Sequence, residues 1–401
     1  MKQFARKLID LRTRLWLYLF RVFTKIRANR VILWSTRGSQ YSCNPKYIAE
    51  YLSEKEPGCY DITFAFKPQC MDMSVPDTIR KVRIYNWSHR LPGIVFLYYL
   101  STSKYIITNF RCSGRDGMLS KRSGQFYIMT YHGGWGTKPI EADHFFSERS
   151  KALQKKENDI TDLFLSSCPD RTMEIRRAQG YRGNILELGS PRDDIFFDKK
   201  KMFDTKEIVY SFYNIPRDCG LILYAPTFRD QNHNNLDVYK INWSKVISAF
   251  TERFGCNFYV LLRLHSHIMH LSNDVHTLMN DPRTINATRY SDMQELLAAS
   301  DFLITDYSSS PFDYAYTGRA CFLYCPDYEQ YITMDRTELK LDIRKLPFPY
   351  SGSEQELCDC VLSFDYESYR ETLSDYLKNE LHTFETGHAC EALAAWMKEN
   401  K

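Results

Sequence analysis

The sequence lacks the cysteine spacing of a zinc site or a redox pair. Its 12 cysteines include no CxxC pair, and the closest are Cys358 with Cys360 and Cys321 with Cys325. Zinc and thiol-redox motifs need thiols at short, fixed spacings. Scattered cysteines without a secretion signal are typical of a reducing cytosol, where most are core residues. Because no Asp-x-Asp pair is present either, we expect no metal site and no cofactor.

Long apolar runs are missing as well. The longest run near the N-terminus, Leu15–Phe20, is too short for a signal-peptide core or a membrane span, and no small-residue cleavage site follows it. Short-period repeats and low-complexity segments are also absent. We therefore expect neither a secretion signal nor a transmembrane helix.

The chain has no large excess of one charge. Its net charge is +4, yet residues 1–30 hold nine Lys or Arg and one acid, Asp10. The first 30 residues thus carry +8, and the remainder carries −4. This distribution argues against a nucleic-acid-binding domain, so we expect no nucleic-acid partner.

Residues 1–30 have the pattern of a basic amphipathic helix. Apolar residues recur every three or four positions, and basic residues largely fill the other faces. Such helices lie in membrane interfaces with their cations toward anionic headgroups. The alternative is a helix packed on the protein's own surface or on a partner; the charge density and aromatic content favour the membrane. The apolar positions are Phe4, Leu8, Leu11, Leu15, Leu19, Val22 and Ile26, with Trp16, Tyr18 and Phe20 as the aromatic residues.

The rest of the chain alternates between strand-like and helical stretches. Its 401 residues, 44% of them hydrophobic, suffice for two domains with large cores. Strands separated by helices predict a doubly wound parallel sheet, and the alternation restarts after residue 195. We expect two Rossmann-like α/β domains, 31–195 and 196–401, facing a cleft in the arrangement called GT-B. The Lys-rich segment Lys199–Lys206 is interpreted as a solvated connection.

The stretch Asp301–Tyr331 contains a strand, a serine-rich turn and a short helix. The strand Phe302–Thr305 leads to Ser308–Ser310, a helix is expected over Pro311–Thr317, and a second strand over Ala320–Tyr324. A helix start after a parallel strand offers free N–H groups and hydroxyls, which suit a phosphate. The alternative is an ordinary capped helix that binds nothing.

A histidine follows another predicted strand. His132 lies in the loop Tyr131–Pro139, directly after the strand Phe126–Thr130. The glycines after it let a ligand approach the backbone closely. Because histidine titrates near neutral pH, His132 is a candidate general base for an alcohol. A structural role is the alternative.

Two further motifs also run from a strand into a turn. Arg229 ends one of them and offers forked donors to a phosphate, unless it pairs with Asp230. His265 ends the other. A metal site with His267 and His270 is not favoured, because no carboxylate stands at helical spacing to them. Ligands of doubly wound sheets bind beyond the carboxyl ends of the strands, where all these motifs are expected.

Taken together, these motifs resemble the CDP-glycerol glycerophosphotransferases, which build teichoic acids and related phosphopolymers of bacterial surfaces. The resemblance covers about residues 31–375 in order and spacing. It implies a GT-B fold, a CDP-alcohol donor and attachment to the inner face of the cell membrane. The similar lines are QYSCNPKYIAEYL, TYHGGWGTK, LELGSPRDDIFF, ILYAPTFRD, LLRLH, ITDYSSSPFDYA, FLYCPDYEQY and LDIRKLPFPY.

The resemblance also implies roles for individual residues. His132 is the expected base, and His265 contacts the donor phosphate. The serine turn holds the pyrophosphate with Arg229 nearby, and Arg192 lies near the nucleotide. The implied set comprises the catalytic His132 and His265, the donor-binding Arg192, Thr227, Arg229, Arg263, Ser308, Ser309, Ser310 and Asp313, and the acceptor-side Gly133, Gly134 and Lys138.

The implied reaction is attack of an acceptor hydroxyl on the β-phosphorus of a CDP-activated polyol, with release of CMP. The acceptor is a lipid-linked saccharide or a polyol phosphate of teichoic acid or capsule synthesis. This sequence departs from the family pattern at Ser190 and Asp193 and inserts Gly134-Trp135-Gly136, which bears on the acceptor. The choice between glycerol and ribitol, and between primase and polymerase, stays open, although the chain length favours a primase or capsule transferase.

Two alternatives remain at this point. A GT-B glycosyltransferase acting on a nucleotide sugar would use the same architecture, with Asp313 or Glu329 contacting the sugar. A non-catalytic membrane scaffold of the same pathway is the other. The presence of both His132 and His265 argues against the scaffold.

Overall fold

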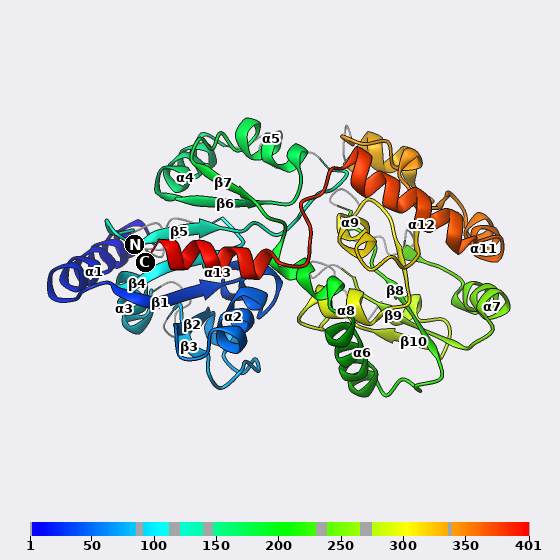
Figure 1. The fold of residues 1–401 in the computed structure, drawn as a ribbon, viewed down its shortest axis with the longest axis horizontal. Coiled ribbons are helices and arrows are strands. Elements are labelled where there is room, and N and C mark those ends of the chain that lie inside the picture. The colour runs from blue at the N-terminus through cyan, green and yellow to red at the C-terminus, as the bar shows by residue number, and fades with distance from the viewer. Residues whose placement is uncertain are drawn as a thin grey trace. The chain divides into compact units, whose positions relative to one another are not determined.

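The computed structural model describes residues 2–85, 91–111, 121–138, 147–229, 239–264, 275–335 and 339–400. The chain forms two compact units (Figure 1). Unit 1 contains Met1–Gly134, Glu141–Asp194 and Phe384–Lys401, and unit 2 contains Trp135–Ile140 and Ile195–Thr383. The segment Phe384–Lys401 thus belongs to the N-terminal unit, although the expected second domain, 196–401, includes it.

Unit 1 is built on a seven-stranded parallel sheet in the order β3-β2-β1-β4-β5-β6-β7. Both faces of β1 are covered: Val31 and Leu33 pack into one hydrophobic cluster, Ile32 and Trp34 into another. This follows from the alternation of side chains along a strand and explains the unbroken apolar run. The strands are β1 Arg27–Trp34, β2 Asp61–Phe66, β3 Arg80–Arg83, β4 Ser103–Thr108, β5 Phe126–Met129, β6 Leu163–Ser166 and β7 Asn184–Glu187.

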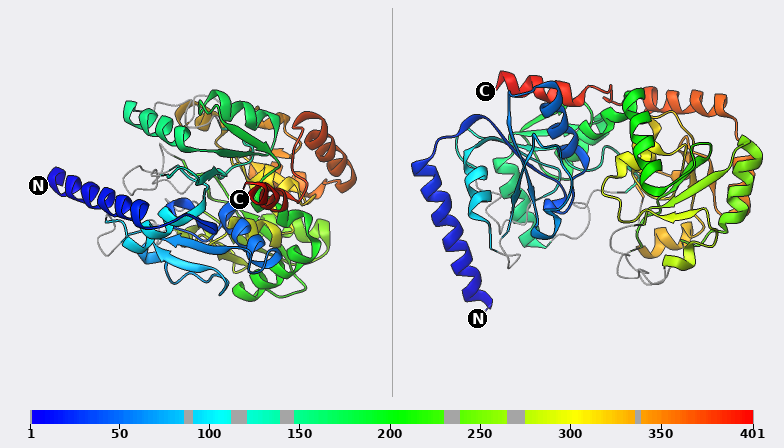
Figure 2. Two further views of the ribbon diagram at one scale, coloured as in Figure 1. Left: turned by 60° about the vertical axis from the view of Figure 1, so that its left-hand side comes forward. Right: turned by 90° about the horizontal axis from the view of Figure 1, so that it is seen from below.

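The helices of unit 1 include the first and the last of the chain. The C-terminal helix, red in Figure 1, packs against α2, and Figure 2 shows it from two further sides. Asp194 accepts hydrogen bonds from the first amides of this helix, Ala389 N (2.9 Å) and Cys390 N (2.8 Å), and so fixes its start. The helices are α1 Lys2–Phe23, α2 Cys43–Lys55, α3 Ile94–Thr102, α4 Glu148–Ile160, α5 Pro169–Arg177 and α13 Ala389–Glu399.

Unit 2 is built on a six-stranded parallel sheet in the order β10-β9-β8-β11-β12-β13. Phenylalanine rings, among them Phe250, Phe302 and Phe322, pack on one another in its core. The strands are β8 Gly220–Tyr224, β9 Phe258–Leu262, β10 Thr284–Asn286, β11 Phe302–Thr305, β12 Cys321–Tyr324 and β13 Tyr350–Ser351. The helices are α6 Lys199–Tyr213, α7 Trp243–Phe254, α8 Met293–Ala299, α9 Ser310–Ala315, α10 Tyr328–Gln330, α11 Glu354–Leu362 and α12 Tyr366–Asp375.

The two parallel sheets confirm the predicted pair of Rossmann-like α/β domains. In each sheet the strand order reverses once, between β1 and β4 in unit 1 and between β8 and β11 in unit 2. Ligands of such sheets bind at this switch point, beyond the carboxyl ends of the strands. The loops after β1, β4 and β5, and those after β8 and β11, are therefore where a site is expected.

One expectation about the segment that follows the first domain is wrong. The Lys-rich segment Lys199–Lys206 is not a solvated connection but the first half of α6. Asp198 caps this helix by accepting from Lys201 N (2.9 Å). Met202 and Thr205 are buried three residues apart, while the lysines occupy other faces. The clustered lysines made the helical spacing of the buried residues hard to recognise in the sequence.

The predicted amphipathic helix is present as α1, although it ends at Phe23 and β1 begins at Arg27. One face packs on the protein's own surface: α1 contacts α3, Leu17 is buried, and the Phe20 ring lies 5.6 Å from that of Tyr98. Arg122 donates to Thr24 O (3.0 Å) just beyond the helix end. The helix is thus part of unit 1, and its opposite face is left exposed.

Candidate active site

The candidate base of unit 1 is held between two aromatic rings. His132 follows β5, and its ring stacks on Phe110 at 4.7 Å and on Tyr131 at 4.6 Å between centroids. Its Nδ1 lies 3.1 Å from the carbonyl oxygen of Asn109, which follows β4. A carbonyl oxygen only accepts, so Nδ1 carries the proton and Nε2 keeps its lone pair. The free lone pair is what a general base requires.

The surroundings of His132 keep its imidazole neutral. The residue is exposed, yet protein atoms crowd it closely. This desolvation is the main cause that lowers its pKa to about 4, and Arg192, Arg171 and Arg37 lower it further. The bond to Asn109 opposes the shift only partly. At neutral pH the ring is therefore unprotonated.

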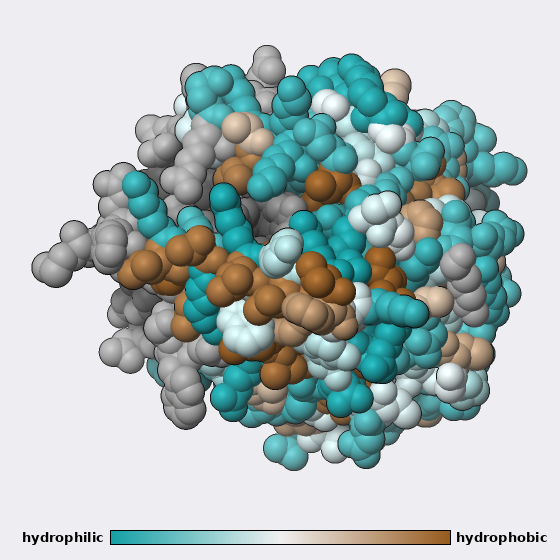
Figure 3. Space-filling view, turned by 90° about the vertical axis from the view of Figure 1, so that its left-hand side faces the viewer, coloured by the Kyte–Doolittle hydropathy of each residue, from teal (hydrophilic) through white to brown (hydrophobic). Residues whose placement is uncertain are grey.

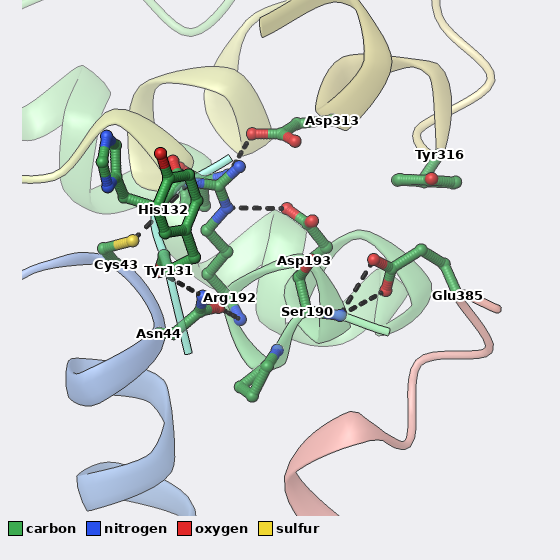
Figure 4. Close-up of polar contacts among 12 residues, drawn as sticks. Cys43, Asn44, Tyr131, His132, Ser190, Arg192, Asp193, Asp313, Tyr316 and Glu385 are labelled. Atoms are coloured by element: carbon green, nitrogen blue, oxygen red, sulfur yellow. Dashed lines mark hydrogen bonds and ion pairs between the residues drawn. The ribbon is translucent and has the colours of Figure 1, made fainter. Parts of the chain in front are cut away.

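Arg192 and Asn44 brace the loop that carries His132 (Figure 4). The Asn44 side chain donates to Thr130 O (3.2 Å) and Tyr131 O (3.0 Å), and its Oδ1 accepts from Arg192 N (3.0 Å). The Arg192 guanidinium donates to His132 O. In this geometry, the predicted donor residue Arg192 contacts the backbone that holds the base.

Backbone strain is concentrated at the carboxyl edge of the unit 1 sheet. Within the described residues, six non-glycine residues have positive φ, and four of them surround this edge. A non-glycine residue in the left-handed region costs roughly 1–2 kcal/mol, and such strain clusters at functional sites. The four are Thr36 (φ 46°), Arg37 (φ 56°), Cys43 (φ 58°) and Tyr131 (φ 58°).

A buried carboxyl group ties the returning C-terminal segment to this edge. Both side-chain oxygens of Glu385 accept from Ser190 N, at 2.8 and 2.9 Å (Figure 4). Burial and the neighbouring Asp193 raise the pKa of Glu385 well above its ordinary value. Gly189, with φ of +90°, provides the space for this carboxyl group, because a Cβ there would lie 2.4 Å from a Glu385 carboxyl oxygen.

We expect Glu385→Gln to reduce the pH dependence of stability. The raised pKa of Glu385 means that its contribution is fully present below pH ~4.5 and is lost as pH rises through the folded-state pKa, by about 1.4 kcal/mol per pH unit. Glutamine keeps an acceptor for Ser190 N and has no charge to lose. Thermal midpoints from pH 5 to 8 test this, with Glu385→Ala as the control that loses the acceptor at every pH. Parallel curves for Glu385→Gln and the unaltered chain would contradict it.

The core of the unit 2 site is an arginine between two aspartates. Arg229 is 1% exposed; its Nη2 lies 2.9 Å from Asp306 Oδ2, and its Nε lies 2.7 Å from Asp327 Oδ2. Burial lowers the pKa of Arg229, but Asp306 and Asp327 outweigh it and raise the pKa above its ordinary value. The guanidinium also lies 4.9 Å from the ring centroids of Tyr307 and Tyr331. Arg229 thus joins the loops after β8, β11 and β12.

The serine turn differs locally from the predicted cap. Ser309 precedes α9 but makes no capping bond with its side chain. Ser308 Oγ instead accepts from Ser310 N (3.2 Å) and from Ser310 Oγ (2.9 Å). Thr227 N donates to Asp306 (2.8 Å), and the buried Thr227 hydroxyl has no hydrogen-bond partner within the described residues. Hydroxyls therefore gather at this edge beside the exposed Ser309.

The inserted residues after His132 pack on the same turn. Thr137 Oγ1 donates to Tyr307 O (3.0 Å), and Lys340 N donates to Thr137 O (2.9 Å). Gly136 is needed for this approach, because a Cβ there would lie 3.1 Å from that of Ser309. Lys340 Nζ lies 3.3 Å from the Trp135 ring centroid. These residues belong to unit 2, although the segment begins only three residues after the candidate base.

The remaining predicted residues are placed as follows. Arg263 donates to the carbonyls of Ala287 and Thr288, and Asp313 accepts from Gln294 (2.9 Å). Lys138 lies 5.9 Å from the Tyr331 ring centroid. Gly133 is partly exposed and Gly134 is buried. His265 lies outside the described residues, so its assignment stays a prediction.

Several residues of these sites were not singled out from the sequence. They are Arg37, Asn44, Asn109, Phe110, Asp327 and Glu385. Asn109 carried one signal in the sequence, because it directly follows β4, and His132 stands three positions after Met129, the last residue of β5. Asp327 lies in the line FLYCPDYEQY, but nothing local pointed to its partner Arg229, 98 residues away. Glu385 carried no signal, since its partner Ser190 lies 195 residues away.

Comparisons with known proteins identify relatives along nearly the whole chain. A family model described as CDP-Glycerol:Poly(glycerophosphate) glycerophosphotransferase matches residues 16–395. The teichoic acid poly(glycerol phosphate) polymerase of Bacillus spizizenii is 29% identical over 332 residues, 80% of this chain and 80% of that protein. The teichoic acid glycerol-phosphate transferase of Staphylococcus aureus is 27% identical over 376 residues, 90% and 89% of the two chains.

Among solved structures, the wall teichoic acid polymerase TagF has a similar fold. The TM-score is 0.79 at 24% identity, and the alignment covers 100% of this chain and 98% of that one. At this identity the likeness shows the fold alone, and it agrees with the two parallel sheets described above.

Proposed function

Because the chain belongs to the CDP-glycerol:poly(glycerophosphate) glycerophosphotransferase family, we propose that it transfers glycerol phosphate from CDP-glycerol to a hydroxyl group during teichoic acid synthesis. The observation that carries the proposal is the family match over residues 16–395 together with a neutral histidine at the sheet edge. The acceptor is a lipid-linked saccharide or a polyol phosphate. CMP is the second product.

The reaction begins with the acceptor hydroxyl. His132 Nε2 takes the proton, and the oxygen attacks the β-phosphorus of CDP-glycerol. The bond between this phosphorus and the bridging oxygen breaks, and CMP leaves with the electron pair. A phosphodiester now joins the acceptor oxygen to the transferred glycerol phosphate. Positioning and charge stabilisation supply most of the catalysis in such transfers.

The donor phosphates are assigned to unit 2. The hydroxyls of Ser308, Ser309 and Thr227 offer hydrogen bonds, and His265 remains the predicted contact to the donor phosphate. Arg229 is assigned a positioning role, because Asp306 and Asp327 occupy its guanidinium. It fixes Asp306, and through the following residues the serine turn. Arg192, in unit 1, steadies the loop of His132.

The function is tested by incubating the protein with CDP-glycerol and a lipid-linked acceptor and identifying the nucleotide released. CMP release that depends on the acceptor, with a phosphodiester in the product mass, supports the proposal. A UDP-sugar serves as the control donor. Release of UDP instead of CMP would identify a glycosyltransferase, and no turnover with any donor would favour a scaffold.

Membrane attachment through α1 is part of the proposal. No helix in the described ranges is both long and apolar enough to span a membrane. The outer face of α1 nevertheless exposes a hydrophobic stripe with hydrophilic side chains beside it (Figure 3). Its exposed large residues are Leu8, Leu11, Leu15, Tyr18, Val22 and Phe23, with Ile94 and Val95 of the neighbouring α3. Lys7, Arg14 and Arg21 are exposed on the same helix and suit anionic headgroups.

We expect Leu11→Ser/Leu15→Ser to release the protein from anionic vesicles. These side chains are 65% and 54% exposed, so their loss removes apolar contact with lipid and leaves the core intact. Each leucine buried in lipid contributes about 1.5–3 kcal/mol, hence a tenfold or larger loss of binding. Vesicle sedimentation measures it, with Phe203→Ser/Ile208→Ser on α6 as the matched control. Equal binding by both double variants would exclude this face as the anchor.

A further inference from the structure

A stack of alternating rings and guanidinium groups is centred on His132. Phe110 and Tyr131 cover the two faces of the imidazole at 4.7 and 4.6 Å. Arg37 lies 4.6 Å from the Phe110 ring centroid, and Arg171 lies 4.1 Å from that of Tyr131. The candidate base therefore has a positive charge one ring away on either side.

The two guanidinium groups have different surroundings. Arg171 is 5% exposed, and its Nη1 lies 3.1 Å from the Glu174 carboxylate, which balances its charge. Arg37 is exposed and donates to the carbonyl oxygen of Arg111 (3.1 Å). Within the described residues it has no carboxylate partner. Arg37 thus presents an uncompensated charge at the open end of the stack.

The turn that carries Arg37 is strained and is tied to the base. Thr36 and Arg37 both have positive φ, 46° and 56°, directly after β1. Thr36 N donates to Asn109 Oδ1 (3.0 Å), and the backbone oxygen of the same asparagine faces His132 Nδ1. One residue therefore sets the position of both the base and the Arg37 turn. Strained backbone of this kind clusters at active sites and ligand clamps, which favours a binding function for this turn.

We propose that Arg37 binds a phosphate group of the acceptor next to the hydroxyl that His132 deprotonates. This deepens the proposed function and rests on it: the acceptor end is then a polyol phosphate and not a neutral saccharide. In a terminal glycerol phosphate, three carbons separate the hydroxyl from the phosphate, which suits a base and a cation one ring apart. The arginine fork matches two phosphate oxygens.

The electrostatics of His132 support this assignment. Desolvation and the nearby arginines lower the pKa of His132 to about 4, lower than is useful for taking a proton at neutral pH. A bound phosphate offsets the charge of Arg37 and raises the pKa of His132 toward its ordinary value. The substrate itself would thus activate the base.

The experiment compares Arg37→Gln and Arg37→Lys with the control Arg80→Gln. Arg80 is also exposed in unit 1, with its guanidinium 5.4 Å from the Tyr99 ring centroid. Acceptor KM is measured for a lipid-linked saccharide with and without one terminal glycerol phosphate. We expect Arg37→Gln to raise KM for the phosphate-bearing acceptor about tenfold or more. This variant should then no longer prefer the phosphate-bearing acceptor to the neutral saccharide. Arg37→Lys should be intermediate, and Arg80→Gln should keep the preference.

A binding measurement separates this inference from the proposed function. Histidine-labelled protein is titrated with sn-glycerol 3-phosphate, and with CDP as the donor probe, while the His132 resonance and its pKa are followed by NMR. We expect glycerol 3-phosphate to raise the pKa of His132 and to bind at least tenfold more weakly to Arg37→Gln, with CDP affinity unaffected. This binding result tests the assignment of Arg37 even if the protein turns over no CDP-alcohol. Unchanged glycerol 3-phosphate affinity in Arg37→Gln, or a loss confined to CDP, overturns the assignment.

Discussion

Replacement of His132 by alanine is expected to lower kcat by about a hundredfold or more and to leave the affinity for CDP-glycerol nearly unchanged. The base takes part in proton transfer, and its interactions matter mainly in the transition state. The geometry makes the requirement specific: Asn109 fixes the proton on Nδ1, and the lone pair on Nε2 stays available. Steady-state rates beside donor calorimetry separate the two effects. Near-normal turnover by the alanine variant would refute the mechanism.

The pH dependence provides a second readout of the same residue. The active form is the unprotonated imidazole, and its pKa is lowered to about 4. As pH falls, kcat/KM for the free enzyme should therefore stay level through pH 6.5 and decline only when the pH approaches 4. An acidic limb near 6.5 would show that the arginines and the desolvation do not act on the base as described.

Replacement of Arg229 by alanine is expected to destabilise unit 2 by about 3–5 kcal/mol, because Asp306 and Asp327 are left as buried, unpaired charges. Their side chains are only 2% and 10% exposed. Asp306 also accepts from Thr227 N, so the loss extends to the loop after β8. Urea unfolding measures the effect. An alanine variant as stable as the unaltered chain would contradict this assignment.

Two further variants separate the effect of the forked guanidinium geometry of Arg229 from the effect of its positive charge. Arg229→Lys keeps the charge, but a single ammonium group cannot bond both carboxylates as the guanidinium does, so an intermediate loss is expected. The combination Arg229→Met, Asp306→Asn and Asp327→Asn removes all three charges and should recover much of the stability. Donor affinity should stay reduced in this combination, since the serine turn loses its tether. Full recovery of donor binding would mean that Arg229 does not position the turn.

The features that the sequence predicted correctly are those that depend on residues close together in the chain. Val31–Trp34 is a continuous apolar run, and only a strand covered on both faces explains it. His132 and the serine turn each come shortly after such a run. Their place at the carboxyl end of a sheet could therefore be predicted from their position in the chain. The amphipathic period of α1 was visible in the same way.

The errors came from contacts between distant residues. The lysines of Lys199–Lys206 were interpreted as solvated because the buried face of α6 depends on what packs against it. The expected contact of Arg229 with a phosphate stays a prediction, and nothing local showed that Asp327, 98 residues away, pairs with this arginine. The segment after Phe384 was assigned to the second domain, because nothing local indicates that Asp194 caps its helix.

By itself, the sequence determined the class of fold, the family and the strand ends where the chemistry lies, because side-chain period and motif order are properties of neighbouring residues. The tertiary structure alone decided which side chains meet there. It stacked Phe110 and Tyr131 on His132, held that ring by Asn109, enclosed Arg229 between two carboxylates, and left Arg37 exposed. The physical reason is that burial and pairing set the charge state and reach of a side chain, and both depend on residues that folding brings together from distant positions.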